Sequence, residues 1–401
     1  MRRVQSDGSK ETIQGSGTML WNEIIAEAQV NRMELHKIPE PCWQEKKTFH
    51  HLVTNLEQYK IHWRPCSKTG LLAYFAQGAS GDHIALRTDM DGLVMDEANE
   101  LEYKSTQKGC MHGCGHDGHM AVMLATARWL KIHEDKLPGP VTLIFQPAEE
   151  GGYGAREMIA DGALDGVDKI FGWHNWPAIQ YGKAVCRAGV VMAANASFSI
   201  DVQGRGGHAS QPDICNDPVL GAAAITLGLQ QIVSRRLPPQ QAAVVSVTSI
   251  DAKSGETVIP DMAILKGSVR MASTKGLTNI GELIEESASY IAKGYGLEAV
   301  VHFKQRYPAV VNTAKEAGEF GHYLTQVFGE EYGCQETAVP LMASEDFSYY
   351  LEKVPGAFAL IGAGNGGRYS IPCHNTTYDF NDRLIEPMVQ AMSLAAGLPL
   401  P

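Results

Sequence analysis

The fold class follows most directly from residues 83–146, which contain HIALRT (83–88), HMAVMLATARWLKIHE (119–134) and VTLIFQ (141–146). The first and the last of these segments are short apolar runs, which predict buried strands. The middle segment has apolar residues at helical spacing and predicts a helix. A strand, a helix and a second strand in this order are typical of an α/β fold, in which helices pack on the faces of a sheet.

The same alternation continues on both sides of this segment. It predicts further strands at 71–76, 169–173 and 357–364 and further helices at 20–36, 313–329 and 386–397. We therefore expect residues 19–192 and 308–401 to form one large domain, with a mixed sheet flanked by helices. Residues 1–18 are polar and lack the apolar core of a secretion signal, so we expect a flexible N-terminal extension there.

The segment between these two parts has a different pattern. Residues 196–204 alternate apolar and polar side chains, as a half-exposed strand does. A helix, two strands, a second helix and a last strand are predicted to follow, at 216–236, 242–250, 262–271, 277–296 and 298–305. The order β-α-β-β-α-β is that of the ferredoxin-like split βαβ unit. We expect residues 193–307 to form an α+β domain that is inserted into the larger one.

Composition narrows the class of protein. A chain of 401 residues with 44% hydrophobic and 20% charged residues is typical of a globular protein of about two domains. The formal net charge of −11 argues against nucleic acid and anionic membranes as partners. No apolar run approaches the ~18 residues that a membrane span needs. Eight cysteines in so long a chain are not a disulfide scaffold, and we expect a cytoplasmic protein with reduced thiols.

Four places in the larger domain concentrate side chains that can bind metal ions. Each follows a predicted strand or a glycine-rich turn, where open α/β sheets place their active sites. They are RTDMDG (87–92), GCMHGCGHDGH (109–119), QPAEEGG (146–152) with GWHNW (172–176), and PCHN (372–375). A centre of two metal ions needs about this many ligands from separate strand ends, so the four places support one another.

The strongest of these places contains Cys114 and His116, which flank a single glycine. In a tight loop, these two positions can present a thiolate and an imidazole to one ion. Cysteine, histidine and carboxylate together suit Zn, Mn, Co or Ni. For His112 and His119 we expect a structural or supporting role rather than metal binding.

Glu149 and Glu150 are adjacent carboxylates at the end of a predicted strand. Such a pair repels unless a cation lies between the two groups or one of them is protonated. We expect one of them to bind metal and the other to act as a general base. His174 lies between two tryptophans and His374 in a polar turn; each is a weak candidate alone, and both gain weight from the other sites.

Other catalytic motifs are missing or lack their context. The sequence has no HExxH, GxSxG or P-loop motif. Gly362, Gly364 and Gly367 form GxGxxG after a predicted strand, but no helix is predicted to follow, as a dinucleotide site would require. Cys110 and Cys114 form CxxxC rather than the CxxC of redox proteins.

Several stretches together resemble the aminoacylase-type metallopeptidases, peptidase family M20, subfamily D. They are GCMHGCGHDGHMA, FQPAEEGGYGAREMI, GRGGHASQP, VIPD followed by GSVR, and SEDFSYY. The resemblance covers nearly the whole chain after Met19 and is greatest to the hippurate hydrolases and indole-acetyl-amino-acid hydrolases. It implies that residues 19–192 and 308–401 are a catalytic domain with a binuclear metal site. It also implies that residues 193–307 are a lid domain through which a homodimer forms.

The resemblance further implies a role for each matching residue. The metal ligands would be Cys114, as the bridging ligand, with His116, Glu150, His174 and His374. Glu149 would be the general base, and Asp89 would orient a metal ligand. In the lid, His208 would contact the substrate carbonyl and Arg270 would hold a substrate carboxylate. Thr257 stands where the family usually has an asparagine that contacts the substrate.

The function implied is metal-dependent hydrolysis of the amide bond of N-acyl-L-amino acids, such as N-acetyl or benzoyl derivatives. The products would be a carboxylic acid and a free amino acid, and the attacking group a metal-bridged water activated by Glu149. Two divalent ions per subunit, Zn, Mn, Co or Ni, would be the cofactors. A dipeptidase or carboxypeptidase with the same centre is the main alternative. The others are an inactive metal-binding protein and a thiol redox protein, which would have a Cys110–Cys114 disulfide.

Overall fold

The computed structural model describes residues 9–334 and 336–400 and divides the chain into two compact units. Unit 1 comprises residues Met1–Gly189, Asn312–Thr337 and Tyr349–Pro401, and unit 2 comprises Val190–Val311 and Ala338–Ser348. The chain crosses between them within a few residues of the expected boundaries. Residues 338–348 differ from the expectation, because they group with unit 2. Backbone hydrogen bonds that Leu341 exchanges with Val191 and Ala193, at 2.9 and 2.8 Å, hold this segment there.

Unit 1 is built on a seven-stranded mixed sheet with the order β1-β2-β4-β3-β5-β15-β6. The four central strands are parallel: β4 (Val141–Gln146), β3 (Ile84–Asp89), β5 (Lys169–Gln180) and β15 (Gly356–Gly364). Three antiparallel strands complete the edges: β1 (His62–Cys66), β2 (Gly70–Phe75) and β6 (Ala184–Val185). The continuously apolar runs thus form the buried centre of the sheet, and the expected mixed sheet is confirmed.

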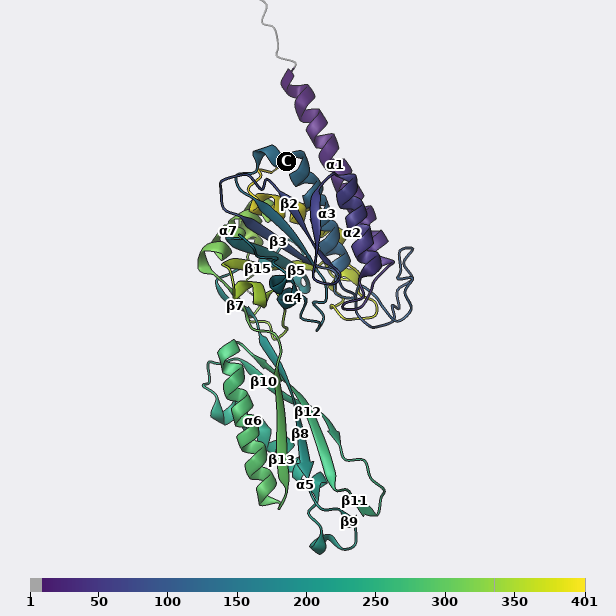
Figure 1. Ribbon diagram of the computed structural model, residues 1–401, viewed down its shortest axis with the longest axis vertical. Helices are drawn as coiled ribbons and strands as arrows, with labels where there is room; N and C mark the ends of the chain where they lie inside the picture. Colours follow the sequence, from purple (N-terminus) through teal and green to yellow (C-terminus); the bar gives the residue numbers. More distant parts are fainter. Residues whose placement is uncertain (1–8, 335, 401) are drawn as a thin grey trace, which may run out of the picture. The chain divides into compact units, whose positions relative to one another are not determined.

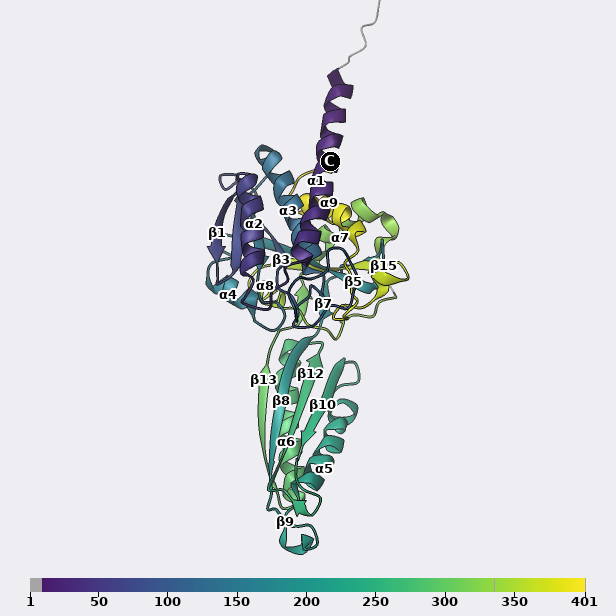
Figure 2. The ribbon, with the colours of Figure 1, turned by 90° about the vertical axis from the view of Figure 1, so that its right-hand side faces the viewer.

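Helices cover this sheet (Figures 1 and 2). They are α1 (Ser9–His36), α2 (Lys46–Gln58), α3 (His116–Ile132), α4 (Gly154–Ala160), α7 (Ala314–Phe328) and α9 (Ile385–Ala395), and the short α8 (Ser348–Leu351) spans a unit boundary. In one layer, α1, α3, α9 and α7 lie side by side in that order. Since α3 lies in the middle of that layer, almost all of its residues are buried. This position accounts for the nearly uniform apolar character of residues 120–130.

The N-terminal extension expected over residues 1–18 differs from the structure in its second half. Helix α1 begins at Ser9, and residues 1–8 lie outside the described residues. Once a helix is nucleated, each further residue adds one backbone hydrogen bond. The helix can therefore extend over residues 9–18 even though this segment is polar.

Unit 2 has the expected β-α-β-β-α-β order. Its elements are β8 (Ala194–Gln203), α5 (Pro218–Gln231), β10 (Ala243–Asp251), β12 (Met262–Met271), α6 (Thr274–Gly294) and β13 (Glu298–Gln305). The strands form an antiparallel sheet with the order β10-β12-β8-β13. Phe198, Ile200 and Val202 alternate with more exposed residues on β8 and join a core with the buried faces of α5 and α6. The Asp217 carboxylate caps α5 by accepting from Val219 N, at 2.8 Å.

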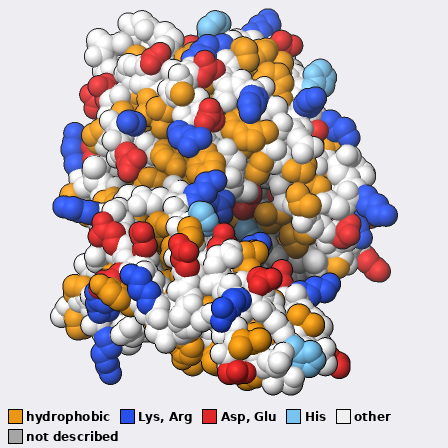
Figure 3. All heavy atoms as spheres, turned by 60° about the horizontal axis from the view of Figure 1, so that its bottom comes forward, with side chains coloured by type: hydrophobic (Ala, Val, Ile, Leu, Met, Phe, Trp, Pro, Cys, Tyr) orange, Lys and Arg blue, Asp and Glu red, His pale blue; other side chains and the backbone are white. Residues whose placement is uncertain are grey.

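Two short strand pairs complete the topology. Strand β9 (Gly207–His208) pairs with β11 (Val258–Ile259), and β7 (Gly189–Met192) pairs with β14 (Val310–Asn312). None of the described helices is both long enough and apolar enough to cross a membrane. On the face shown in Figure 3, Lys and Arg side chains are interspersed with Asp and Glu side chains, so neither sign of charge dominates that face.

Candidate metal centre

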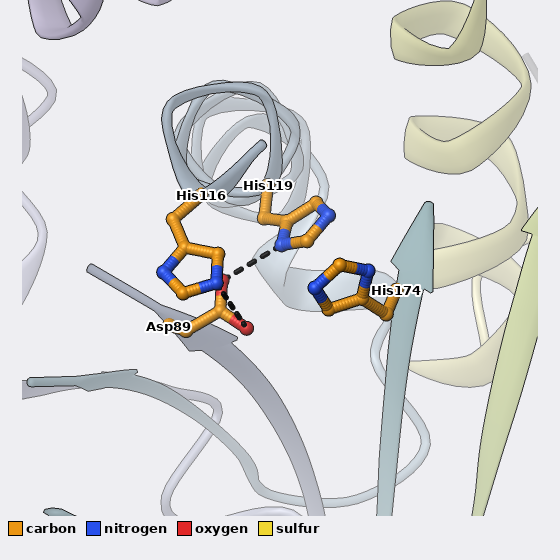
Figure 4. Close-up of side chains that lie close together, drawn as sticks. All are labelled: Asp89, His116, His119 and His174. Atoms are coloured by element: carbon orange, nitrogen blue, oxygen red, sulfur yellow. Dashed lines mark hydrogen bonds and ion pairs between the residues drawn. The ribbon is translucent and has the colours of Figure 1, made fainter. Parts of the chain in front are cut away.

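Asp89 is the last residue of β3 and is completely buried. Its Oδ2 accepts a hydrogen bond from Arg87 Nη1 at 2.8 Å, and its Oδ1 accepts one from His119 Nδ1 at 2.7 Å. Oδ2 also lies 3.8 Å from His116 Nε2 (Figure 4). Burial opposes ionisation, but the charges of His116, His119 and Arg87 hold the pKa of Asp89 well below its usual range. Asp89 is therefore an anion that faces the imidazole groups of this site.

His116 is the first residue of α3, and the turn before it brings its ring into the site. Gly115 has a φ of 97°, and a Cβ at this position would lie 2.3 Å from Asn175 Oδ1, so only glycine fits. His116 Nδ1 donates to the backbone carbonyl of Asp91 at 2.9 Å. Its Nε2 is buried and has no hydrogen-bond partner among the described residues. Burial alone would lower the pKa of His116, but Asp89 and Asp91 raise it to about 10, so the surroundings favour a cation here.

Cys114 and His174 meet in the same place. Cys114 Sγ lies 3.3 Å from His174 Nε2, and His174 Nδ1 donates to the carbonyl of Asn175 at 2.6 Å. Burial, with the neighbouring His119, holds the pKa of His174 well below its usual range, so this ring is neutral. A hydrogen bond with the thiol of Cys373, together with burial, raises the pKa of Cys114. A bound cation has the opposite effect and stabilises the thiolate.

Glu150 and His374 complete the group. His374 Nε2 lies 3.1 Å from Glu150 Oε1, and the backbone N–H of His374 donates to the carbonyl of Gly113 at 2.8 Å. This backbone bond joins the turn at 372–375 to the glycine-rich segment that carries Cys114. Ligand atoms of Cys114, His116 and Glu150 all lie within 4.8 Å of one another. The five residues expected to bind metal, which come from four separate segments, are thus brought together.

His119 lies among these groups, but both of its ring nitrogens have partners. Nδ1 is bonded to Asp89, and Nε2 lies 2.7 Å from Asn175 Oδ1. A supporting role for His119 remains the expectation from the sequence, and these two contacts are compatible with it. His112 is also buried, and burial lowers its pKa to about 4. Neither ring nitrogen of His112 has a hydrogen-bond partner in the described part of the chain.

Glu149 is 7% exposed and follows β4. The pKa of the Cys114 thiol is raised by Cys373, by burial and by Glu150, and the carboxylate of Glu149 adds to these causes. The backbone N–H groups of Glu149 and Glu150 donate to Oδ1 and Oδ2 of Asp91, at 3.0 and 2.9 Å. Sequence reasoning did not select Asp91. The available signal was a second carboxylate two residues after Asp89, in RTDMDG.

The two expected substrate-binding residues belong to unit 2. His208 is exposed on β9, and its Nδ1 accepts a hydrogen bond from Ser210 Oγ at 2.8 Å. Arg270 is half-buried on β12 and donates to Ser344 Oγ at 2.8 Å. Burial and the neighbouring Arg306 lower the pKa of Arg270. Thr257 is exposed, and its carbonyl accepts from Ala209 N at 2.9 Å.

The donors of unit 1 fit a divalent cation. They combine one thiol, imidazole nitrogens and carboxylates, which suits zinc and related metals. In His116 and His174, a backbone carbonyl accepts from Nδ1, and this leaves Nε2 for a ligand. Because His116 Nε2 is buried without a partner in the described residues, a metal ion would satisfy it. All eight cysteines, Cys110 and Cys114 included, are free thiols, so the disulfide of the redox alternative is absent from the described residues.

Comparisons with known proteins agree with this geometry. A family model described as peptidase family M20/M25/M40 matches residues 85–397. The hippurate hydrolase of Campylobacter jejuni is 35% identical over 381 residues, which are 94% of this chain and 97% of that protein. The N-acetyl-L-cysteine deacetylase of Bacillus subtilis is 37% identical over 333 residues, which are 82% of this chain and 79% of that protein. Among solved structures, the YXEP protein of Bacillus subtilis matches with a TM-score of 0.81 and 30% identity. The match covers 94% of this chain and 98% of that protein, which is described as a dinuclear metal binding peptidase from the M20 family.

Proposed function

Because the chain belongs to peptidase family M20/M25/M40, we propose that it is a metal-dependent amidohydrolase that cleaves N-acyl-L-amino acids to a carboxylic acid and a free amino acid. The relatives named for hippurate and for N-acetyl-L-cysteine support this class of substrate. The observation that carries the proposal is the convergence of five metal-binding side chains beside Glu149. They are Cys114, His116, Glu150, His174 and His374.

We assign these five residues to the binding of two divalent ions per subunit, Zn, Mn, Co or Ni. When bound, such ions polarise a carbonyl group and lower the pKa of a water molecule toward neutrality. Asp89 orients the imidazole of His119 by accepting from its Nδ1, and its other oxygen lies 3.8 Å from Nε2 of the ligand His116.

Glu149 serves as the general base in this proposal. Its carboxylate takes a proton from the attacking water and delivers that proton to the leaving amine, so no other proton donor is needed for the products. The burial of Glu149 supports this role, because electrostatic interactions are stronger where water is excluded. His208 donates a hydrogen bond to the substrate carbonyl oxygen as negative charge develops there. Arg270 binds the carboxylate of the amino-acid part.

Substrate specificity provides the direct test of this function. A panel of N-acetyl and N-benzoyl amino acids should be hydrolysed faster than free dipeptides, in the presence of Zn, Mn, Co or Ni. A chelator should abolish the activity, and added metal should restore it. Preference for free dipeptides or peptides would instead support the dipeptidase or carboxypeptidase alternative, and no turnover on the whole panel would support a metal-binding protein without activity.

The proposed role of Arg270 predicts how its removal affects substrate binding. Arg270→Ala should raise KM for acyl amino acids by about tenfold or more, while kcat changes little, because a charge-assisted contact to the substrate carboxylate is lost in ground and transition states alike. Steady-state kinetics measures both values. The matched control is Arg236→Ala, which removes another unit 2 arginine that is paired with Glu286 on the surface. An unchanged KM in Arg270→Ala would remove this residue from the carboxylate site.

We also propose a homodimer that forms through unit 2. Strand β10 lies at an edge of its sheet, where backbone groups can pair with another strand. On α5, Val219, Leu220 and Leu227 are exposed, and Leu227 is 75% exposed. A cytoplasmic location is part of the proposal as well, because free cysteines persist in a reducing compartment.

A substitution at Leu227 tests whether the proposed dimer forms through α5. Leu227→Asp should weaken self-association by about tenfold or more, because a charge would be buried in an apolar interface. Sedimentation velocity over a range of concentrations measures the dissociation constant. Val30→Asp, which places the same charge at a 59% exposed position in unit 1, should leave it unchanged. Equal association constants for the two variants would contradict a dimer through α5.

A further inference from the structure

We infer that Asp91 is a positioning residue that holds the turn carrying the general base and the metal ligand His116 in a fixed relation to each other. The inference rests on the proposed function, in which Glu149 is the base. Asp91 lies two residues beyond the end of β3 and is 1% exposed. It differs from the ligands in that it contacts the backbone of one segment and the ring of another.

The first contact is with the turn that follows β4. Ala148 has a φ of 58°, in the left-handed region, and Gly151 has a φ of 96°. In this turn the three successive N–H groups of residues 148, 149 and 150 all donate to carboxylates. Ala148 N donates to Glu45 Oε1 at 2.9 Å, and the next two donate to the two oxygens of Asp91 at 3.0 and 2.9 Å. Successive amides that point to one side form an anion-binding concavity, and here the Asp91 side chain occupies it.

The second contact is with His116. The backbone carbonyl of Asp91 accepts from His116 Nδ1 at 2.9 Å, and Asp91 Oδ1 lies 3.5 Å from the same nitrogen. These acceptors keep the proton on Nδ1 and direct Nε2 toward the other ligands. One residue therefore determines both the orientation of the His116 ring and the position of the backbone that carries Glu149 and Glu150.

The contacts of Asp91 argue against a role as a metal ligand. Oδ1 accepts from Glu149 N, and Oδ2 accepts from both Glu150 N and Cys42 Sγ, the latter at 3.2 Å. Both oxygens are thus turned toward N–H and S–H donors of the protein. Asparagine has nearly the same shape but presents one amide NH₂ group, which cannot accept from a backbone N–H. Asp91→Asn therefore replaces one of the two acceptors by a donor and breaks at least one of the two bonds to the turn, with the least change in volume.

The test compares Asp91→Asn with Asp96→Asn. Asp96 is exposed on the loop after Asp91 and also accepts from one backbone N–H, that of Gly109, at 2.8 Å. With N-acetyl-cysteine or hippurate as substrate, Asp91→Asn should lower kcat by about 100-fold and change KM by less than about threefold. Asp96→Asn should retain the wild-type kcat. Equal kcat values for the two variants would overturn the inference.

A double-mutant cycle separates positioning from a general structural role. If Asp91 acts through Glu149, adding Glu149→Gln to Asp91→Asn should lower kcat by less than about tenfold, a much smaller loss than Glu149→Gln causes in the wild type. Full additivity of the two losses would show that Asp91 does not act through Glu149.

Hydrogen exchange provides a measurement that does not depend on activity. In the metal-free protein, the amides of Glu149 and Glu150 should exchange about tenfold faster in Asp91→Asn than in Asp96→Asn. Asp91→Ser, which retains one hydroxyl acceptor, serves as the second variant if the asparagine variant does not fold. Unchanged exchange rates at these two amides would show that Asp91 does not fix the position of the turn. This outcome does not depend on whether the wild type hydrolyses acyl amino acids, so it is distinct from a failure of the proposed function.

Discussion

Glu149→Gln should lower kcat by about 10²- to 10⁴-fold while the metal content stays at the wild-type level. Glutamine has the shape of glutamate but does not take up a proton at neutral pH, so the proton transfer from water to the leaving amine is lost. The metal ligands, Glu150 included, are unchanged. Metal analysis of the dialysed protein and steady-state kinetics on N-acyl amino acids measure the two effects separately.

The control for this variant lies a few residues away. Glu157 is a half-buried glutamate on α4 that pairs with Arg156, and Glu157→Gln should retain the wild-type kcat. If Glu149→Gln kept most of its activity, the assignment of Glu149 as the base would be wrong. If it lost metal together with activity, Glu149 would be a ligand rather than the base.

Glu150→Ala should produce the opposite pattern at the neighbouring position. Its carboxylate lies 3.1 Å from His374 and within 4.8 Å of Cys114 and His116, so its removal takes away a donor from the centre of the group. We expect metal affinity to fall by at least about 100-fold, which is the upper range for residues that only support a ligand. Activity should fall with metal occupancy.

Thermal unfolding distinguishes these two variants without any substrate. A metal ion that binds only the folded state stabilises that state by about 2.7 kcal/mol when its free concentration is 100 times its Kd. The wild type and Glu149→Gln should therefore show a rise in Tm on addition of zinc, and Glu150→Ala should show little or none. His116→Ala should behave like Glu150→Ala. A normal zinc-dependent rise in Tm for Glu150→Ala would exclude this residue as a ligand.

Local sequence patterns were sufficient for the main elements of both units. The predicted strands at 83–88 and 141–146 correspond to β3 (Ile84–Asp89) and β4, because a strand buried on both faces needs apolar side chains at successive positions. The alternation on β8 correctly indicated a strand with one buried face. Polar residues 9–18 were harder to interpret, since they belong to the same helix, α1, as residues 20–36, whose apolar spacing was the signal for a helix.

The candidate metal ligands could be named from sequence because their residue types and their places near predicted strand ends and turns carry the chemical signal. Among these candidates, Cys114, Glu150 and His374 lie in bends or turns, His116 begins α3 and His174 lies within β5. Asp91 carried no such signal, since a carboxylate beside Asp89 could equally have been a ligand or a surface group. Only its hydrogen bonds to Glu149 N and Glu150 N distinguish it.

Residue type and periodicity thus predicted the two-unit α/β architecture and the chemistry of the donor groups, because both depend on neighbours within one element. The tertiary structure alone defined which nitrogen of each imidazole faces the site. His116 and His119 lie on the same helix turn, yet His116 Nε2 has no hydrogen-bond partner in the described residues, while both nitrogens of His119 are engaged by Asp89 and Asn175. Those partners come from strands 30 and 56 residues away in sequence, and a hydrogen bond between distant segments forms only when the fold brings them together.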